Sequence, residues 1–158
     1  MIDLNTYITE KLKITKDISY IYDYHPKDKD ELIDIVDKLL EERGINADLN
    51  DVDVSKITDF GRLFYKNTKI KNINISDWNV SNAIYMDEMF SGCYHFNSDI
   101  SKWDVSNVKT FSNMFSQCLH LADCDFELWK DKIKEDAQTD FMFSGCNELK
   151  IPSWYKRK

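Results

Sequence analysis

Trp78-Asn-Val-Ser-Asn-Ala-Ile-Tyr-Met-Asp-Glu-Met-Phe-Ser-Gly-Cys93 matches Trp103-Asp-Val-Ser-Asn-Val-Lys-Thr-Phe-Ser-Asn-Met-Phe-Ser-Gln-Cys118 without a gap. The two stretches share Trp, Val, Ser, Asn, Met, Phe, Ser and Cys at an offset of 25 residues. Weaker copies lie upstream at 53–64 and downstream at 141–146. A regular period of roughly 20–29 residues is typical of leucine-rich repeats. Because one such unit cannot bury its apolar face alone, the sequence predicts a stack of units.

The pattern within one unit predicts its local structure. Met86, Met89 and Phe90 have the i, i+3, i+4 spacing of a short helix. The segment before each Trp, such as Asn74-Ile75-Ser76, alternates polar and apolar residues as a strand does. We therefore expect each coil to contain a short strand, a turn with the Asx-Val-Ser sequence and a short helix.

Stacking places equivalent residues of successive coils above one another. The predicted internal ladders are Leu49, Ile75, Ile100 and Phe126; Val54, Val80 and Val105; and Phe64, Phe90, Phe115 and Phe143. These residues are expected to form the core and to have no direct functional role.

The first 45 residues lack the repeat and are predicted to form an N-terminal helical cap. Asp28 and Glu31 have the spacing of a capping box, an apolar face follows, and Gly44 is a candidate C-cap. Residues 4–13 form a second amphipathic pattern, so a partner-docking helix pair is the alternative. Residues 46–152 hold about four repeats, and residues 153–158 form a tail whose Trp is expected to pack on the last coil. The whole is expected to be one structural domain.

The motif Trp-Asp-Val-Ser-Asn-Val-x-x-Phe-x-x-Met-Phe-x-x-Cys resembles the BspA-type leucine-rich repeat. The resemblance covers about residues 47–151 and implies an α/β solenoid of right-handed coils with short parallel strands and short helices. It also implies surface proteins that bind host proteins, without catalytic residues in the repeats. The chain departs from the pattern at Thr139, which stands where Met86 and Phe111 stand, and at Trp129, which is out of step.

Composition narrows the classes of function. The net charge of −7 and pI of about 4.9 disfavour direct nucleic-acid binding and favour a basic partner, although solubility alone is a sufficient reason for the charge. The start of the sequence shows no secretory signal, and no window is apolar enough to span a membrane. Four cysteines are few for a secreted disulfide scaffold. The expected location is the bacterial cytoplasm, with a phage-encoded origin as one hypothesis.

A strip of polar residues on the strands is the candidate binding surface. Residues that flank the internal Ile ladder point outward, and adjacent parallel strands lie roughly 4.8 Å apart. One row holds Asp48, Asn74, Asp99 and Asp125, and the other holds Asn50, Ser76, Ser101 and Glu127. The carboxylates of this strip predict a concave acidic face for a basic partner; a merely solvated face is the alternative.

Metal binding and catalysis are not expected. Cys93 with His95 and Cys118 with His120 recur at one repeat position. Residues two apart in an extended segment point to opposite sides, so buried cysteines leave the histidines outside. The sequence contains no phosphate-binding glycine loop and no nucleophile elbow. We expect no cofactor, no catalytic residue and no metal ligand.

The sequence thus predicts a non-enzymatic module, monomeric when free, that recognises a protein partner through a rigid surface. One specific hypothesis is a small phage or mobile-element inhibitor of a host defence or nucleic-acid-handling complex. The alternative is a fragment or variant of a bacterial surface adhesin that binds host proteins.

Overall fold

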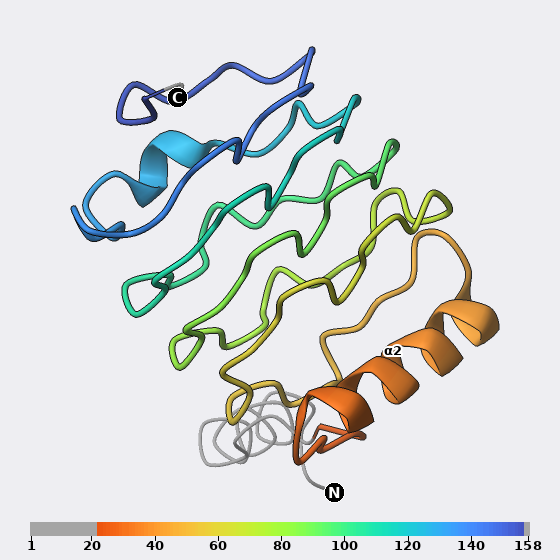
Figure 1. Ribbon diagram of the computed structural model, residues 1–158. Helices are drawn as coiled ribbons and strands as arrows, with labels where there is room; N and C mark the ends of the chain where they lie inside the picture. The colour runs from red at the N-terminus through yellow and green to blue at the C-terminus, as the bar shows by residue number, and fades with distance from the viewer. Residues whose placement is uncertain (1–21, 157–158) are drawn as a thin grey trace, which may run out of the picture.

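The computed structural model describes residues 22–156, which wind into a row of stacked coils running from helix α2 to the C-terminal tail (Figure 1). Within this range the helices are α2 (Lys29–Arg43) and the 3₁₀-helix η1 (Phe126–Trp129). Adjacent coils are joined by isolated parallel β-bridges, among them Asp59 to Tyr85, Tyr85 to Thr110 and Thr110 to Gln138. The sequence predicts short strands, but the described residues contain only these isolated bridges and no continuous strand. No helix in that part of the chain is long and apolar enough to cross a membrane.

The predicted helix before the repeats is present as α2. Asp28 caps it by accepting the N–H of Glu31, and Gly44 ends it with a φ of +83°, which glycine adopts without strain. Its buried face of Leu32, Val36 and Leu39 joins the common core. The other helix predicted for the cap, at 4–13, lies outside the described residues.

Three apolar ladders fill the interior, as the repeat predicts. The Ile, Val and Phe ladder residues are all less than 5% exposed. The phenyl rings form a column, with centroid separations of 5.2 Å from Phe64 to Phe90, 5.6 Å from Phe90 to Phe115 and 5.6 Å from Phe115 to Phe143. This continuous column buries the apolar face that no single coil could bury alone.

Tryptophans tie each coil to the one before it. The indole N–H groups of Trp78, Trp103 and Trp129 donate to the carbonyls of Leu49, Ile75 and Ser101, at 2.8, 3.0 and 3.1 Å. Trp154 repeats the contact with the carbonyl of Phe126 at 2.8 Å. Trp129 makes the same kind of bond, but its acceptor Ser101 lies one residue beyond Ile100, the equivalent of Leu49 and Ile75, so Trp129 is displaced by one residue from the series. Trp154 begins a fifth unit, so the boundary predicted at residue 153 divides a unit.

The predicted short helices are also wrong, and the segments involved carry the backbone ladder instead. We name these segments the turn halves: residues 59–66, 85–92, 110–117 and 138–145. Alternate N–H groups of the first three turn halves donate to carbonyls of the next coil at 2.7–3.0 Å, for example from Phe60 to Tyr85 and from Phe90 to Met114.

Left-handed backbone conformations exclude a helix in the turn halves. Arg62, Glu88, Asn113 and Phe141 hold equivalent positions and have φ between 54° and 62°. An α-helix has φ near −63° throughout. The i, i+3, i+4 spacing of apolar residues arises here because a chain of successive tight turns brings the same positions inward.

Candidate functional site

The predicted strip lies on the opposite side of each coil, in segments that we name the strip halves: residues 48–50, 74–76, 99–101 and 125–127. Its first row, Asp48, Asn74, Asp99 and Asp125, is exposed on four successive coils. The second row is uneven. Asn50 and Ser76 are half-buried, Glu127 is exposed and Ser101 is only 5% exposed.

Ser101 is therefore wrongly predicted as a contact residue. Its carbonyl accepts the indole N–H of Trp129, and its own N–H donates to Asp99. The indole bond holds the segment against the next coil, and the bond to Asp99 closes a turn within its own coil.

Local turns account for the Asp and Asn residues of the first row. The side-chain oxygens of Asp48, Asp99 and Asp125 accept the N–H of the residue two positions later, at 3.0, 2.9 and 3.1 Å. Asn74 does the same for Ser76, whose hydroxyl also donates to it at 3.0 Å. Such side-chain-to-backbone turns favour Asp and Asn for structural reasons. A carboxylate uses one oxygen for the turn and retains a second for other contacts.

The carboxylates of the strip differ in whether their second oxygen already accepts a hydrogen bond. Asp48 accepts the amide of Asn74 at 3.1 Å with its second oxygen. Glu127 accepts both the N–H and the hydroxyl of Ser153, which lowers the pKa of Glu127 below its usual range. In the described chain, the second oxygens of Asp99 and Asp125 make no hydrogen bond, so these two residues carry the available negative charge.

A groove opens between the second and third coils in the middle of the strip. Its lining is polar and consists of Asn72, Asn74, Ser76, Asp77, Asn97, Ser98, Asp99 and Lys102, with Ile73 as the apolar member. At the strip, the first and second coils are joined by two backbone bonds, from the N–H of Leu49 to the carbonyl of Asn74 at 2.9 Å and from the N–H of Asn74 to the carbonyl of Ala47 at 2.8 Å. Between the second and third coils the equivalent bonds would run from the N–H of Ile75 to the carbonyl of Asp99 and from the N–H of Asp99 to the carbonyl of Ile73. Neither bond is formed in the described part of the chain. The strip halves separate here while the turn halves stay paired.

Ser98 gives the groove an unusual property. The residue is only 6% exposed, and its hydroxyl is the one buried side-chain polar group of the described residues that has no hydrogen-bond partner. Buried hydroxyls are nearly always paired. Ser98 also lines the groove. The hydroxyl itself is buried behind this lining, and no group of the described residues satisfies it. Sequence reasoning missed it because a serine outside the repeated positions carries no distinguishing signal.

The histidines and cysteines separate as predicted. Cys93, Cys118 and Cys146 are buried, and their thiols donate to the carbonyls of Phe64, Phe90 and Phe115. Burial raises the pKa of Cys93 to about 12, which removes the thiolate that metal binding or nucleophilic attack needs.

The histidine rings lie outside the coils. His95 and His120 stack with centroids 5.4 Å apart, and His120 Nδ1 lies 2.9 Å from Glu148. The described residues hold no cluster of three or more His, Cys, Asp or Glu suited to a metal ion.

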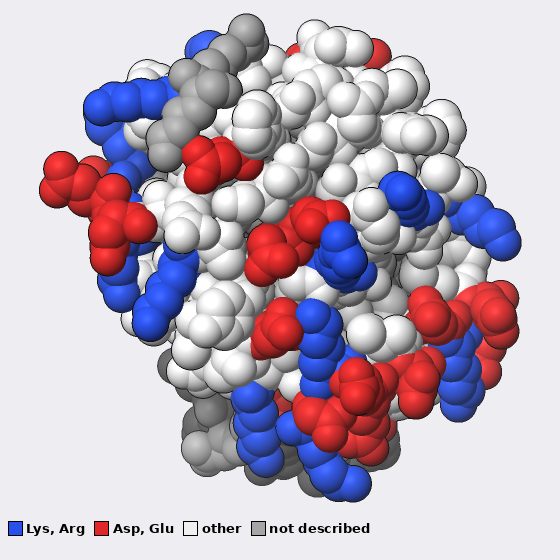
Figure 2. Space-filling model, viewed as in Figure 1, with Lys and Arg blue, Asp and Glu red and all other residues white. Residues whose placement is uncertain are grey.

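Charge is unevenly spread over the surface. Figure 2 shows acidic and basic side chains mixed over the end of the molecule near α2 and, in smaller groups, across the middle of that face, with a broad uncharged area toward the upper right. The structure thus has no single large acidic field on this side, and the acidic character of the strip rests on individual carboxylates.

Residues 34–154 match the family described as "Mycoplasma protein of unknown function, DUF285". Neither the curated proteins nor the solved structures gave a match to the chain.

Proposed function

The chain belongs to the DUF285 family, and we propose that it is a non-enzymatic recognition module that binds a basic protein partner along the strip. The groove at Asn74 and Asp99 carries this proposal. Asp99 presents there a carboxylate oxygen that makes no hydrogen bond within the described chain, whereas the amide oxygens of Asn74 and Asn97 already accept two bonds each. This Asp99 oxygen would accept hydrogen bonds from a Lys or Arg side chain, with Asp125 on the next coil as a second anionic contact.

The repeat architecture supports recognition by a surface. The coils share one apolar interior from α2 to Trp154, so the strip is presented on a rigid support. Repeat proteins commonly bind partners across several units, each of which adds a small contact area. We propose that the units are a form of the BspA-type leucine-rich repeat in which the segment after the Trp turns repeatedly instead of forming a helix.

We propose no catalytic step for the groove. Asp77 and Asp99 are its titratable acids, and Lys102 is its one cation among the described lining residues. The three histidines lie elsewhere, two of them stacked and exposed at the ends of the coils. A site of this composition can hold and orient a charged group, but it lacks an activated nucleophile with an adjacent base.

The test neutralises the strip without altering its turns. In the Asp99→Asn/Asp125→Asn double variant the amide oxygens keep accepting the turn N–H groups, as Asn74 does in the second coil. The matched control is Asp53→Asn/Asp104→Asn. These residues close the same kind of turn on Ser55 and Ser106, and Asn79 holds the equivalent position in the second coil. Both variants remove two negative charges.

The wild-type protein and both variants would serve as baits for a lysate of the organism that encodes the chain, with bound proteins identified by mass spectrometry. We expect a basic protein that is retained by the wild type and the control, weakened by salt, and lost from the strip variant. Equal retention by both double variants would contradict the proposal, because charge at the strip would then be irrelevant.

A further inference from the structure

The turn half of the last coil ends the backbone ladder with a row of free donors. In the third coil, the N–H groups that donate to the fourth coil are those of Phe111, Asn113, Phe115 and Gln117. The equivalent N–H groups of the fourth coil are those of Thr139, Phe141, Phe143 and Gly145. None of the four has an acceptor within the described chain. The carbonyls of Thr139, Phe141 and Phe143 already accept the turn bonds of Met142, Ser144 and Cys146. This edge therefore offers donors at alternate residues and needs carbonyl oxygens as its complement.

Residues up to 156 begin a fifth coil, and they correspond to the strip half and the Trp of the earlier coils. Trp154 ties the tail to Phe126, and the rings of Trp154 and Tyr155 cover the end of the phenylalanine column at 6.3 and 5.1 Å from Phe143. The tail thus closes the interior. Among residues 22–156, nothing takes the place that a fifth turn half would occupy beside 138–145.

Phe141 breaks the repeat at this same edge. Its equivalents are Arg62, Glu88 and Asn113, which are polar, and Arg62 pairs with Glu88 across the coils at 3.0 Å. Phe141 is 54% exposed. Phe141 thus adds an exposed apolar ring beside the row of donors, at a position that is polar in the other coils.

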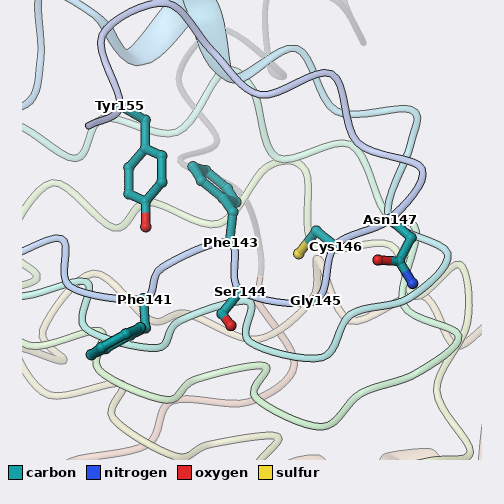
Figure 3. A pocket seen from close by; sticks show the side chains of 7 residues that line it. All are labelled: Phe141, Phe143, Ser144, Gly145, Cys146, Asn147 and Tyr155. Carbon is teal, nitrogen blue, oxygen red and sulfur yellow. The ribbon is translucent and has the colours of Figure 1, made fainter. Parts of the chain in front are cut away.

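A pocket lies along the row of donors. Phe141, Phe143, Ser144, Gly145, Cys146, Asn147 and Tyr155 line it. Figure 3 shows Phe143 and Tyr155 side by side, with the Tyr155 hydroxyl pointing toward the side of the pocket that Phe141 forms. The rings supply apolar contact, and the backbone of 143–145 supplies the polar edge. This combination suits a peptide that presents carbonyls to the row and one apolar side chain to the pocket.

We propose that this edge binds a polypeptide segment of a partner protein, which takes the place of a fifth turn half beside residues 138–145. Unpaired sheet edges are ready templates for another chain, and edge addition is a common mode of peptide recognition. The bonds would have the same register as those between the third and fourth coils. This site is separate from the strip, which lies on the other side of each coil.

The probe is an acetylated and amidated peptide with the sequence of residues 110–117, a turn half whose carbonyls already complete this kind of ladder. We would titrate it into the ¹⁵N-labelled full chain. The expected result is saturable binding with a Kd of about 1 mM or tighter. Binding of the peptide should shift the amide proton resonances of Thr139, Phe141, Phe143 and Gly145 downfield. A peptide of scrambled sequence is the control.

Phe141→Asn is the matched variant, because Asn113 holds the equivalent position with a φ of 56° against 54° for Phe141. We expect this variant to fold normally and to bind the peptide about tenfold more weakly. Asp99→Asn/Asp125→Asn should bind it as the wild type does, which separates this site from the strip.

Hydrogen exchange of the chain without peptide tests whether the N–H groups of the edge are free of hydrogen bonds. The amides of Phe143 and Gly145 should exchange faster than those of Phe115 and Gln117. Slow exchange at the edge, absence of saturable shifts, or shifts unaffected by Phe141→Asn would overturn the proposal. Shifts of the same amides on raising the protein concentration alone would overturn it in favour of a second copy of the chain.

Discussion

The two halves of each coil repeat with the same period but are held together by different groups. Turn halves are joined by main-chain bonds, four between each adjacent pair. Strip halves have main-chain bonds between the first and second coils, and along the rest of the described chain they are joined chiefly by the Trp indoles, while Asp and Asn close turns within each coil. Main-chain bonds make no demand on the outward side chain, so the outward positions at the bridges vary freely as Asp59, Tyr85, Thr110 and Gln138.

This difference changes how repetition should be interpreted. On the strip half an outward Asp or Asn recurs because the turn needs it, so recurrence alone says little about binding. Departures from the repeat are more informative. Ser98 has a hydroxyl without a partner, and Phe141 places an exposed ring where other coils have polar residues. Both departures lie where the coil stack is locally incomplete.

Removing a ring from the shared interior should have the largest effect. Phe90 is fully buried and stacks between Phe64 and Phe115, so Phe90→Ala leaves a cavity in the middle of the column. We expect a loss of about 3–5 kcal/mol in the free energy of unfolding, measured by urea denaturation. Tyr85→Ala, at an exposed position of the same coil, should change it by less than about 0.5 kcal/mol. Similar losses in both variants would show that the column is not the main support.

A smaller loss is expected when one indole donor is removed from the strip halves. Trp103→Phe keeps most of the buried apolar surface but leaves the carbonyl of Ile75 without its 3.0 Å bond. The expected loss is about 1–3 kcal/mol, by the same denaturation measurement. Trp154→Phe, in the half-buried tail, should lose less. Equal losses would mean that the indole bonds stabilise the end of the stack as strongly as its middle.

The core and the coil period could be predicted from the sequence because burial depends on residue type and spacing. Leu49, Ile75 and Ile100 lie inside as expected. The local structure of the turn halves could not be predicted, because a helix and a chain of tight turns can both place residues i, i+3 and i+4 inward. The left-handed residues Arg62, Glu88 and Asn113 are not glycine, so composition gave no warning of them.

The candidate site was only partly predictable for a related reason. Alternation placed Asp48 and Asp99 outward correctly, but it treated Ser101 as exposed, whereas the next coil covers it. Trp103 and Trp129 are 26 residues apart, one more than Trp78 and Trp103, and the Trp129 indole accordingly bonds to Ser101 and not to Ile100. The fifth unit was visible in the sequence, since Trp129 and Trp154 are 25 residues apart, the same separation as Trp78 and Trp103.

The ion pair between α2 and the first coil should make a modest, pH-dependent contribution. Arg43 donates to both carboxylate oxygens of Asp51, at 2.8 and 2.7 Å. These bonds lower the pKa of Asp51 from its ordinary value of 3.8. A lowered folded-state pKa contributes stability above the unfolded value, and this stability is lost as the pH falls through the folded value.

Asp51→Asn should therefore reduce the free energy of unfolding at pH 7 by about 1–2 kcal/mol. Below about pH 4 the reduction should shrink, because the wild-type carboxylate is then being protonated in the unfolded chain. Urea denaturation at pH 7 and pH 3 measures both values. A reduction that is the same at both pH values would indicate that the charge of Asp51 is not the cause.

The smallest expected effect is the reaction of the cysteine row that lies just beyond the turn halves. Cys93, Cys118 and Cys146 are at most 8% exposed, and burial raises the pKa of the Cys93 and Cys146 thiols to about 12. At pH 8 a thiol reagent such as dithionitrobenzoate should release almost no colour from the folded chain and react fully in urea. Partial unfolding of the fourth coil would expose Cys146 first. If Cys146 alone reacts in native buffer, detected by mass spectrometry of the labelled peptide, then the last coil opens independently of the others. A partner segment bound beside 138–145 should suppress that reaction, which would tie the stability of the last coil to occupation of its free edge.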